Sequence, residues 1–119
     1  MRWGMDRAHR TAYRAERGAA ADARRSGDSE LAWHHLERAH VVAQPFPVAH
    51  VGSHAAMLRL AVRLRDRTEV SGQVVRLIVA GPGSLVGRFP VGNTGRASLP
   101  LTAELPIPPD LVELMAEAP

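Results

Sequence analysis

Cysteine and lysine are both absent from this chain of 119 residues, and aromatic side chains are scarce. Without cysteine there is no disulfide, no thiolate zinc site, no cysteine-held iron–sulfur cluster and no thiol nucleophile. Any metal site must therefore use histidine nitrogen and carboxylate oxygen. Because only five residues are aromatic, the core must be built mainly from alanine, valine and leucine.

Long hydrophobic runs are also missing. The longest apolar stretch covers residues 77–86 and is interrupted by Gly-Pro-Gly, so it is too short to span a bilayer. No apolar run follows the arginines near the N-terminus, as a signal peptide would require. We therefore expect a cytoplasmic protein with no membrane association.

All 15 basic residues are arginine, and the formal net charge is only +3. Residues 1–25 contain seven arginines against three acids, whereas residues 97–119 contain four acids and no arginine. A basic first helix is compatible with a nucleic-acid surface. A solvated helix face, partly neutralised by the acidic C-terminal segment, explains the same pattern, and we expect no nucleic-acid partner.

Helical periodicity dominates the chain as far as residue 80. Apolar residues recur at three- and four-residue spacing, and strand-like alternation is scarce. The pattern predicts an all-α fold with one domain over residues 1–119: a small up-and-down bundle of about four helices with a long C-terminal wrap rich in proline and glycine. The expected segments are helices over residues 6–24, 29–43, 48–65 and 69–80, an ordered loop over 81–109, and a short helix over 110–117.

The segment from His34 to His54 holds five of the six histidines, and a Pro-Phe-Pro sequence divides it. His50 and His54 are four residues apart, so both imidazoles point to one side of a helix. If the helices on either side of Phe46 form an antiparallel hairpin, His40 lies opposite the interval between those two histidines. The sequence therefore predicts that these three rings converge.

Carboxylates extend this candidate site. Glu37 precedes His40 by three residues, which is the Glu-x-x-His spacing of carboxylate metal sites in helical bundles. The turn between the first two helices places Tyr13 and Glu16 opposite His40 and Glu37. The arrangement is similar to half of a ferritin-like site, but no second Glu-x-x-His occurs, so we expect a mononuclear site. The expected metal ligands are His40, His50, His54 and Glu37, and the candidate catalytic residues are Glu37, Tyr13 and Glu16.

Several interpretations of this stretch stay open. The ion would be iron, copper or zinc, and haem is the main competing cofactor. The histidines also suit a structural role beside carboxylates, or metal-free acid–base chemistry by a His–Glu pair. The alternatives for the whole protein are a metal-dependent oxidative or hydrolytic enzyme with an unidentified small-molecule substrate, a non-enzymatic interaction module, and a metal or haem carrier or sensor. A homodimer that shares ligands is a further alternative.

The motif GNTGRA, residues 92–97, is typical of a shaped loop. Asn93 and two glycines tolerate positive φ, and Arg88 and Arg96 lie close by in the sequence. The motif favours a loop that either packs over the end of the bundle or binds an anion.

Four stretches between about His34 and Leu111 resemble, as a set, a small bacterial family known as a domain of unknown function. The resemblance rests on HHLERAHVVAQPF, AHVGSHAAML, GQVVRLIVAGPGSLVGRFPVGNTGRA and PIPPDL. It implies a compact, mostly helical protein of this size. The family carries no established activity, so the resemblance transfers no catalytic residue.

Overall fold

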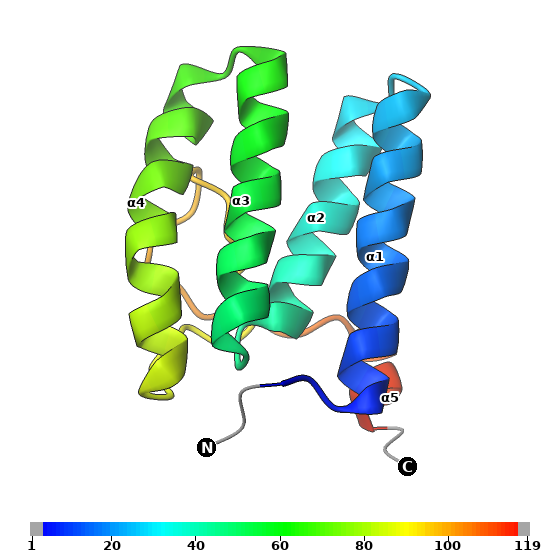
Figure 1. Ribbon diagram of the computed structural model, residues 1–119, viewed down its shortest axis with the longest axis vertical. Coiled ribbons are helices and arrows are strands. Elements are labelled where there is room, and N and C mark those ends of the chain that lie inside the picture. The colour runs from blue at the N-terminus through cyan, green and yellow to red at the C-terminus, as the bar shows by residue number, and fades with distance from the viewer. Residues whose placement is uncertain (1–3, 117–119) are drawn as a thin grey trace.

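The computed structural model describes residues 4–116, and within them the chain forms five α-helices and no strands (Figure 1). The helices are α1 (Arg7–Arg25), α2 (Ser29–Ala43), α3 (Pro47–Leu64), α4 (Arg67–Leu85) and α5 (Pro109–Ala116). The expectation of an all-α helical bundle is confirmed. Over the same residues, no helix is both long and apolar enough to cross a membrane.

Three of the four long helices begin after an aspartate whose carboxylate accepts a hydrogen bond from a backbone N–H of the first turn. The capping pairs are Asp6 with the N–H of His9, Asp28 with that of Leu31, and Asp66 with that of Glu69. The remaining helix, α3, begins with Pro47, whose missing N–H would have no helical partner in the first turn. Because Asp66 is the cap, α4 begins two residues before the start that periodicity predicts.

The C-terminal end of α4 differs from the expectation. The sequence predicts that this helix ends at residue 80, but the prediction is wrong, because α4 continues through Gly81-Pro82-Gly83 to Leu85. Proline removes the hydrogen bond to the carbonyl of Ile78. That residue is 70% exposed, so water can replace the lost donor. The two glycines also leave room for neighbouring segments, since an added Cβ would meet atoms there at 3.3 and 2.8 Å.

The four long helices form two antiparallel pairs, α1 with α2 and α3 with α4, and the pairs meet along α2 and α3 (Figure 1). Alanine supplies much of the buried surface, which lets the helices pack closely. The larger apolar cluster joins α1, α2 and α3. Its members are Ala20, Ala23, Ala32, Trp33, Leu36, Ala56, Met57, Leu60 and Ala61.

After α4 the chain passes behind the bundle as a loop over residues 86–108, drawn in yellow to orange in Figure 1. It then enters α5, which packs against α1 and α2 at the end of the bundle. Leu111 of α5 is fully buried in a second apolar cluster with Ala12, Val41 and Val42. The C-terminal segment is therefore the wrap that its composition predicts, although it begins five residues later.

We expect Leu111→Ala to lower the free energy of unfolding by about 2–5 kcal/mol, because the substitution leaves a cavity between α5 and the α1–α2 pair. The next residue, Val112, is 49% exposed, so Val112→Ala should change the same quantity by less than about 0.5 kcal/mol. Urea denaturation followed by circular dichroism measures both variants. Equal effects of the two substitutions would contradict the anchoring role of Leu111.

Candidate metal centre

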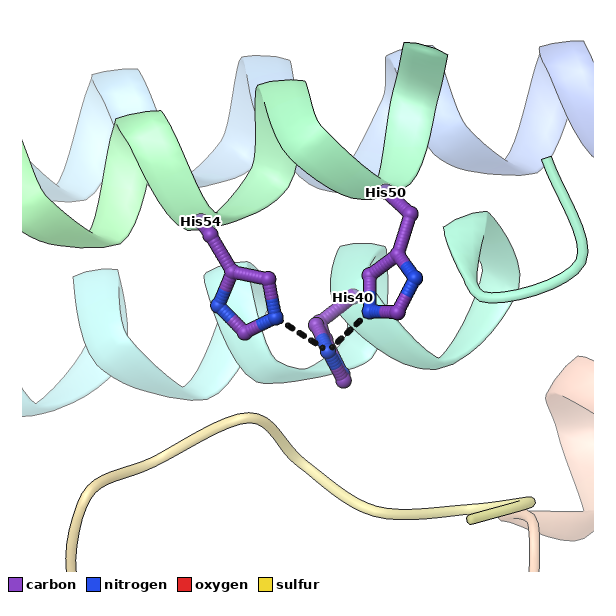
Figure 2. A group of neighbouring side chains, drawn as sticks. All are labelled: His40, His50 and His54. Atoms are coloured by element: carbon purple, nitrogen blue, oxygen red, sulfur yellow. Dashed lines mark hydrogen bonds between the residues drawn. The ribbon is translucent and has the colours of Figure 1, made fainter. Parts of the chain in front are cut away.

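Three buried histidines from two helices converge on one point (Figure 2). His40 lies in the last turn of α2, whereas His50 and His54 project from one face of α3. The Nε2 atom of His40 lies 3.0 Å from Nε2 of His50 and 3.0 Å from Nε2 of His54. None of the three residues is more than 5% exposed. Among residues 4–116, these three histidines form the group whose potential ligand atoms lie close enough together to hold a metal ion.

The second ring nitrogen of His40, Nδ1, is held by the wrap. It lies 2.7 Å from the backbone carbonyl oxygen of Asn93. A carbonyl oxygen carries no proton, so Nδ1 must be the donor. In neutral imidazole only one nitrogen is protonated, and Nε2 of His40 therefore has a free lone pair.

The same tautomer is imposed on His50 by Ser84, which lies in the extra turn of α4 beyond the proline. The Ser84 hydroxyl donates its proton to the backbone carbonyl of Gln44. It is therefore left as an acceptor for Nδ1 of His50, at 2.6 Å. As a result, the Nε2 lone pair of His50 is free as well.

His54 is oriented by Gln73 in the middle of α4. The amide nitrogen of Gln73 donates to the carboxylate of Glu69 and to the carbonyl of Gly95, at 3.1 and 2.8 Å. These two acceptors determine which way the amide group is turned. Its oxygen, Oε1, faces Nδ1 of His54 at 2.7 Å and accepts the proton there.

All three Nε2 lone pairs therefore point into one buried space. Two acceptors at 3.0 Å repel each other unless a proton or a metal ion lies between them. Burial, with a contribution from the neighbouring imidazoles, holds the pKa of His40 well below its usual value and lowers the pKa of His50 to about 4. Burial also lowers the pKa of His54. These shifts disfavour a proton at the centre, whereas neutral imidazole nitrogens are common metal ligands.

The loop over residues 92–97 is shaped to present its carbonyl to His40. The Asn93 side chain is buried, donates to the carbonyls of Pro100 and Ala103 at 3.2 and 2.7 Å, and accepts from the N–H of Gly95 at 2.8 Å. Gly95 has a φ of +84°, and a Cβ there would lie 2.8 Å from Cδ2 of His40. The GNTGRA motif therefore packs against the triad.

The structure places Glu37 outside the triad. Its carboxylate accepts a hydrogen bond from Arg96 at 3.3 Å, and Arg96 also donates to Glu69 at 2.8 Å and lies over the ring of Trp33 at 3.9 Å. Burial raises the pKa of Glu37, while Arg96 opposes this shift. Glu69 is bonded in turn to Gln73. Among residues 4–116, the hydrogen bonds that connect Glu37 to the triad therefore run through Arg96, Glu69 and Gln73.

The side chains of Tyr13 and Glu16 also form hydrogen bonds with residues outside the triad. The Tyr13 hydroxyl accepts a hydrogen bond from Arg17 at 2.7 Å. The Glu16 carboxylate accepts from Arg38 at 3.0 Å and lies 2.8 Å from Nδ1 of His35. Arginines attract these groups, whereas helical spacing determines only which side of a helix a residue is on. The three predicted histidines are thus brought together, and Glu37, Tyr13 and Glu16 are not brought into their group.

Sequence reasoning missed Ser84, Gln73 and Asn93, the residues that orient the triad. Two of them belong to a stripe on the buried face of α4 that is mostly polar. The members of that stripe, at spacings of three and four, are Glu69, Gln73, Arg76, Ala80 and Ser84. This periodicity is visible in the sequence, but valines and isoleucine on the other faces of α4 are the stronger apolar signal.

A cavity of about 220 Å³ adjoins the triad. Arg76 and Arg88 are the charged residues of its lining, and over the described part of the chain the lining contains no aspartate or glutamate. The remaining residues are mostly apolar, including Val79, Phe89 and Leu101. The triad therefore faces a small space with apolar walls and two arginines.

The fold and the site together define a helical-bundle protein with a buried three-histidine centre that is close enough to bind a metal ion. A family model described as "Protein of unknown function (DUF3703)" matches residues 7–115, so the chain belongs to this family. The resemblance to a family of unknown function that the sequence motifs suggest is thereby confirmed. No curated protein and no solved structure matches the chain.

The low pKa values predict that the metal-free protein is sensitive to acid. The unfolded chain takes up protons on these histidines near pH 6.5, about where ordinary histidine titrates, whereas the folded chain resists them. Unfolding therefore binds protons, and the free energy of unfolding falls as the pH decreases from about 6.5 towards 4. For His50, whose pKa is lowered to about 4, the loss is on the order of 3 kcal/mol. Urea denaturation of EDTA-treated protein at several pH values measures this loss.

In the same experiment, His50→Asn should show a shallower dependence on pH, because one of the three protons taken up on unfolding is removed. A free energy of unfolding that stays constant across this range would contradict the neutral, buried state of the triad.

Gly95 and Gly27 form a matched pair for testing the loop. Their φ angles are +84° and +81°, but nothing lies within 4 Å of a Cβ on Gly27, whereas one on Gly95 would overlap the ring of His40. We expect Gly27→Ala to cost about 1 kcal/mol through backbone strain alone, and Gly95→Ala to cost about 1–3 kcal/mol more through overpacking. Urea denaturation of the metal-free proteins compares them. Equal costs would show that the loop does not press against the triad.

Proposed function

We propose that this protein binds one transition-metal ion through Nε2 of His40, His50 and His54, and that it is a metal-dependent enzyme acting on a small molecule. The observation that carries the proposal is the set of three oxygen acceptors behind the rings. They hold every Nδ1 proton and leave three lone pairs aimed at one point. A buried arrangement of this kind gains its stabilisation from a cation at the centre.

The spacing of the three nitrogens suits a bare ion. Histidine nitrogens bound tetrahedrally to zinc at about 2.0–2.1 Å are about 3.3 Å apart, and the two contacts made by His40 measure 3.0 Å. The donor nitrogens of all three rings lie within 4.8 Å of one another, so a small rearrangement of the rings would bring each of them to bonding distance. Three imidazoles at this spacing leave no room for a porphyrin, so a bare ion is favoured over haem.

The open side of the triad favours catalysis over a purely structural role. Structural zinc sites are closed by four protein ligands, whereas catalytic sites keep one position for water or substrate. The cavity beside the triad supplies such a position. Imidazole ligands suit iron, copper and zinc. An ion held here would supply Lewis-acid chemistry or, for iron and copper, redox chemistry.

The residues behind the triad act by orienting the ligands. A hydrogen bond from Nδ1 to oxygen determines the tautomer and the direction of each ring, and such partners usually affect metal affinity strongly. Glu37, a candidate ligand from its spacing, has instead a positioning role in this proposal. It holds Arg96, which holds Glu69, which in turn fixes the amide of Gln73.

Elemental analysis of protein purified without a histidine tag tests the proposal. We expect about one equivalent of iron, copper or zinc per chain, and we expect the His40→Ala/His50→Ala double variant to lose it. The His34→Ala variant should keep the metal, because His34 is exposed and lies outside the triad. Circular dichroism verifies that each variant is folded.

Because removal of two buried rings can unfold the protein, Co(II) provides a second measurement on the unmodified chain. After EDTA treatment, we expect the chain to bind about one equivalent of Co(II), with the visible absorption of a four-coordinate ion with nitrogen ligands. Metal that is retained unchanged in the folded double variant, or wild-type protein that fails to bind Co(II), would refute the metal centre.

A further inference from the structure

The charge around the triad is unbalanced once the proposed ion is bound. Three neutral imidazoles leave the charge of a dication uncompensated, and the cavity lining contains no carboxylate among the residues described. Arg76 and Arg88 line the same cavity and add further positive charge. Partly buried positive charge without an anion is costly. We therefore expect the loaded centre to favour an anion from outside the chain at its open side.

Arg76 is the buried member of this pair, with 8% of its surface exposed. Its guanidinium donates to the backbone carbonyls of Gly72 and Leu99, at 3.2 and 2.9 Å. Carbonyl groups do not neutralise its charge. Glu69 attracts the Arg76 charge but makes its ion pair with Arg96, and no carboxylate within residues 4–116 forms an ion pair with Arg76. Arg76 lines the same cavity as the three histidines, so its charge faces the site that the ion would occupy.

Other arginines around the centre are already paired with acids. Arg96 donates to Glu69 at 2.8 Å, and Arg38 donates to Glu16 at 3.0 Å. The chain thus supplies carboxylates to these arginines but not to the two that line the cavity. An anion that enters the cavity would be the first acidic partner of Arg76, which is buried and forms no ion pair among the residues described.

The walls of the cavity indicate what kind of anion this is. Apart from the triad and the arginines, the lining is largely apolar and includes Val79, Phe89 and Leu101. The volume of about 220 Å³ corresponds to roughly seven water molecules of bulk liquid. It lies below the roughly 300 Å³ at which pockets for drug-sized ligands begin. A ligand with one anionic end and a short hydrocarbon body matches both the charge and the walls.

We infer that the substrate of this site is a small monocarboxylate, whose carboxylate lies between the metal position and Arg76 and whose hydrocarbon part contacts Phe89 and Leu101. The inference rests on the proposed metal centre. An inorganic anion such as phosphate would satisfy the charges but would leave the apolar walls without a partner. The exposed Arg88 attracts anions from solution to the cavity.

Titration of the Co(II)-loaded protein with sodium butyrate, and separately with sodium phosphate, tests the inference. The visible absorption of cobalt reports the entry of an anion at the metal. We expect butyrate to bind at least about 10-fold more tightly than phosphate, and Arg76→Gln to weaken butyrate by about 10-fold or more, since a hydrogen bond to a charged group is lost. Arg59→Gln is the matched control, because Arg59 lines a separate cavity, and it should leave the affinity unchanged.

The outcomes separate the two proposals. If Co(II) binds at about one equivalent but butyrate leaves its spectrum unchanged, the inference is wrong and the metal centre stands. If Co(II) does not bind, the metal centre itself is wrong. Phosphate that binds as tightly as butyrate would overturn the assignment of an organic anion, and an equal affinity in Arg76→Gln would overturn the role of that residue.

A variant at the exposed position covers the case in which Arg76→Gln does not fold. Arg88→Gln should weaken butyrate by about 2–5-fold, as expected for a solvent-screened charge. An unchanged affinity in Arg88→Gln, with Arg76→Gln unfolded, would overturn the assignment of the cavity arginines to anion binding.

Discussion

The placement of the three Nδ1 protons determines what the centre of this bundle can do. Each proton is donated to an oxygen that accepts it: the Asn93 carbonyl, the Ser84 hydroxyl and the amide oxygen of Gln73. Because neutral imidazole carries a single proton, these bonds direct every Nε2 lone pair inward. The acceptors come from the wrap, from the last turn of α4 and from its middle. Helix α4 and the loop after it therefore orient three side chains on α2 and α3.

Helix α4 shows how this requirement shapes the fold. Its buried face is mostly polar, while Val75 and Ile78 are at least half exposed. Buried polar groups are usually hydrogen-bonded. Apart from the Nε2 atoms of the triad, whose lone pairs face one another, no buried side-chain nitrogen or oxygen in residues 4–116 lacks a partner. If one group in such a network lacks its partner, the fold loses stability. When every group is bonded, the network holds the side chains in a single arrangement. The polar face of α4 thus contributes orientation at the site more than it contributes core stability.

Much of the fold follows from local signals in the sequence. The Pro-Phe-Pro break and helical periodicity predict the four long helices and the hairpin that brings His40 opposite His50 and His54. The wrap is predicted by its glycines and prolines. The continuation of α4 through Pro82 is not predicted. A helix tolerates an internal proline when water can reach the carbonyl that loses its hydrogen bond, and this exposure is a property of the assembled structure.

The carboxylates show a second limit of local reasoning. A three-residue spacing puts Glu37 on the same side of α2 as His40, but it does not determine which group the carboxylate meets. Arg96, which lies in a loop 59 residues further along the chain, donates a hydrogen bond to the Glu37 carboxylate. The partners of the triad are equally remote, at separations of 19 to 53 residues. Helical spacing contains no information about contacts at such separations. The convergence of the three histidines was therefore predictable, and the residues that orient them were not.

The position of the triad links the proposed metal to the stability of the bundle. The two helical pairs meet along α2 and α3, and His40 belongs to one pair while His50 and His54 belong to the other. Without a cation, the convergent lone pairs oppose this contact. An ion bound by all three would cross-link the pairs, and because the site forms only in the folded chain, its binding free energy would add to the free energy of folding. Through the Asn93 carbonyl and the close approach of Gly95 to His40, the same ion would also stabilise the wrap. Ligand binding at the cavity and the packing of the wrap against the bundle would then depend on the same three nitrogens.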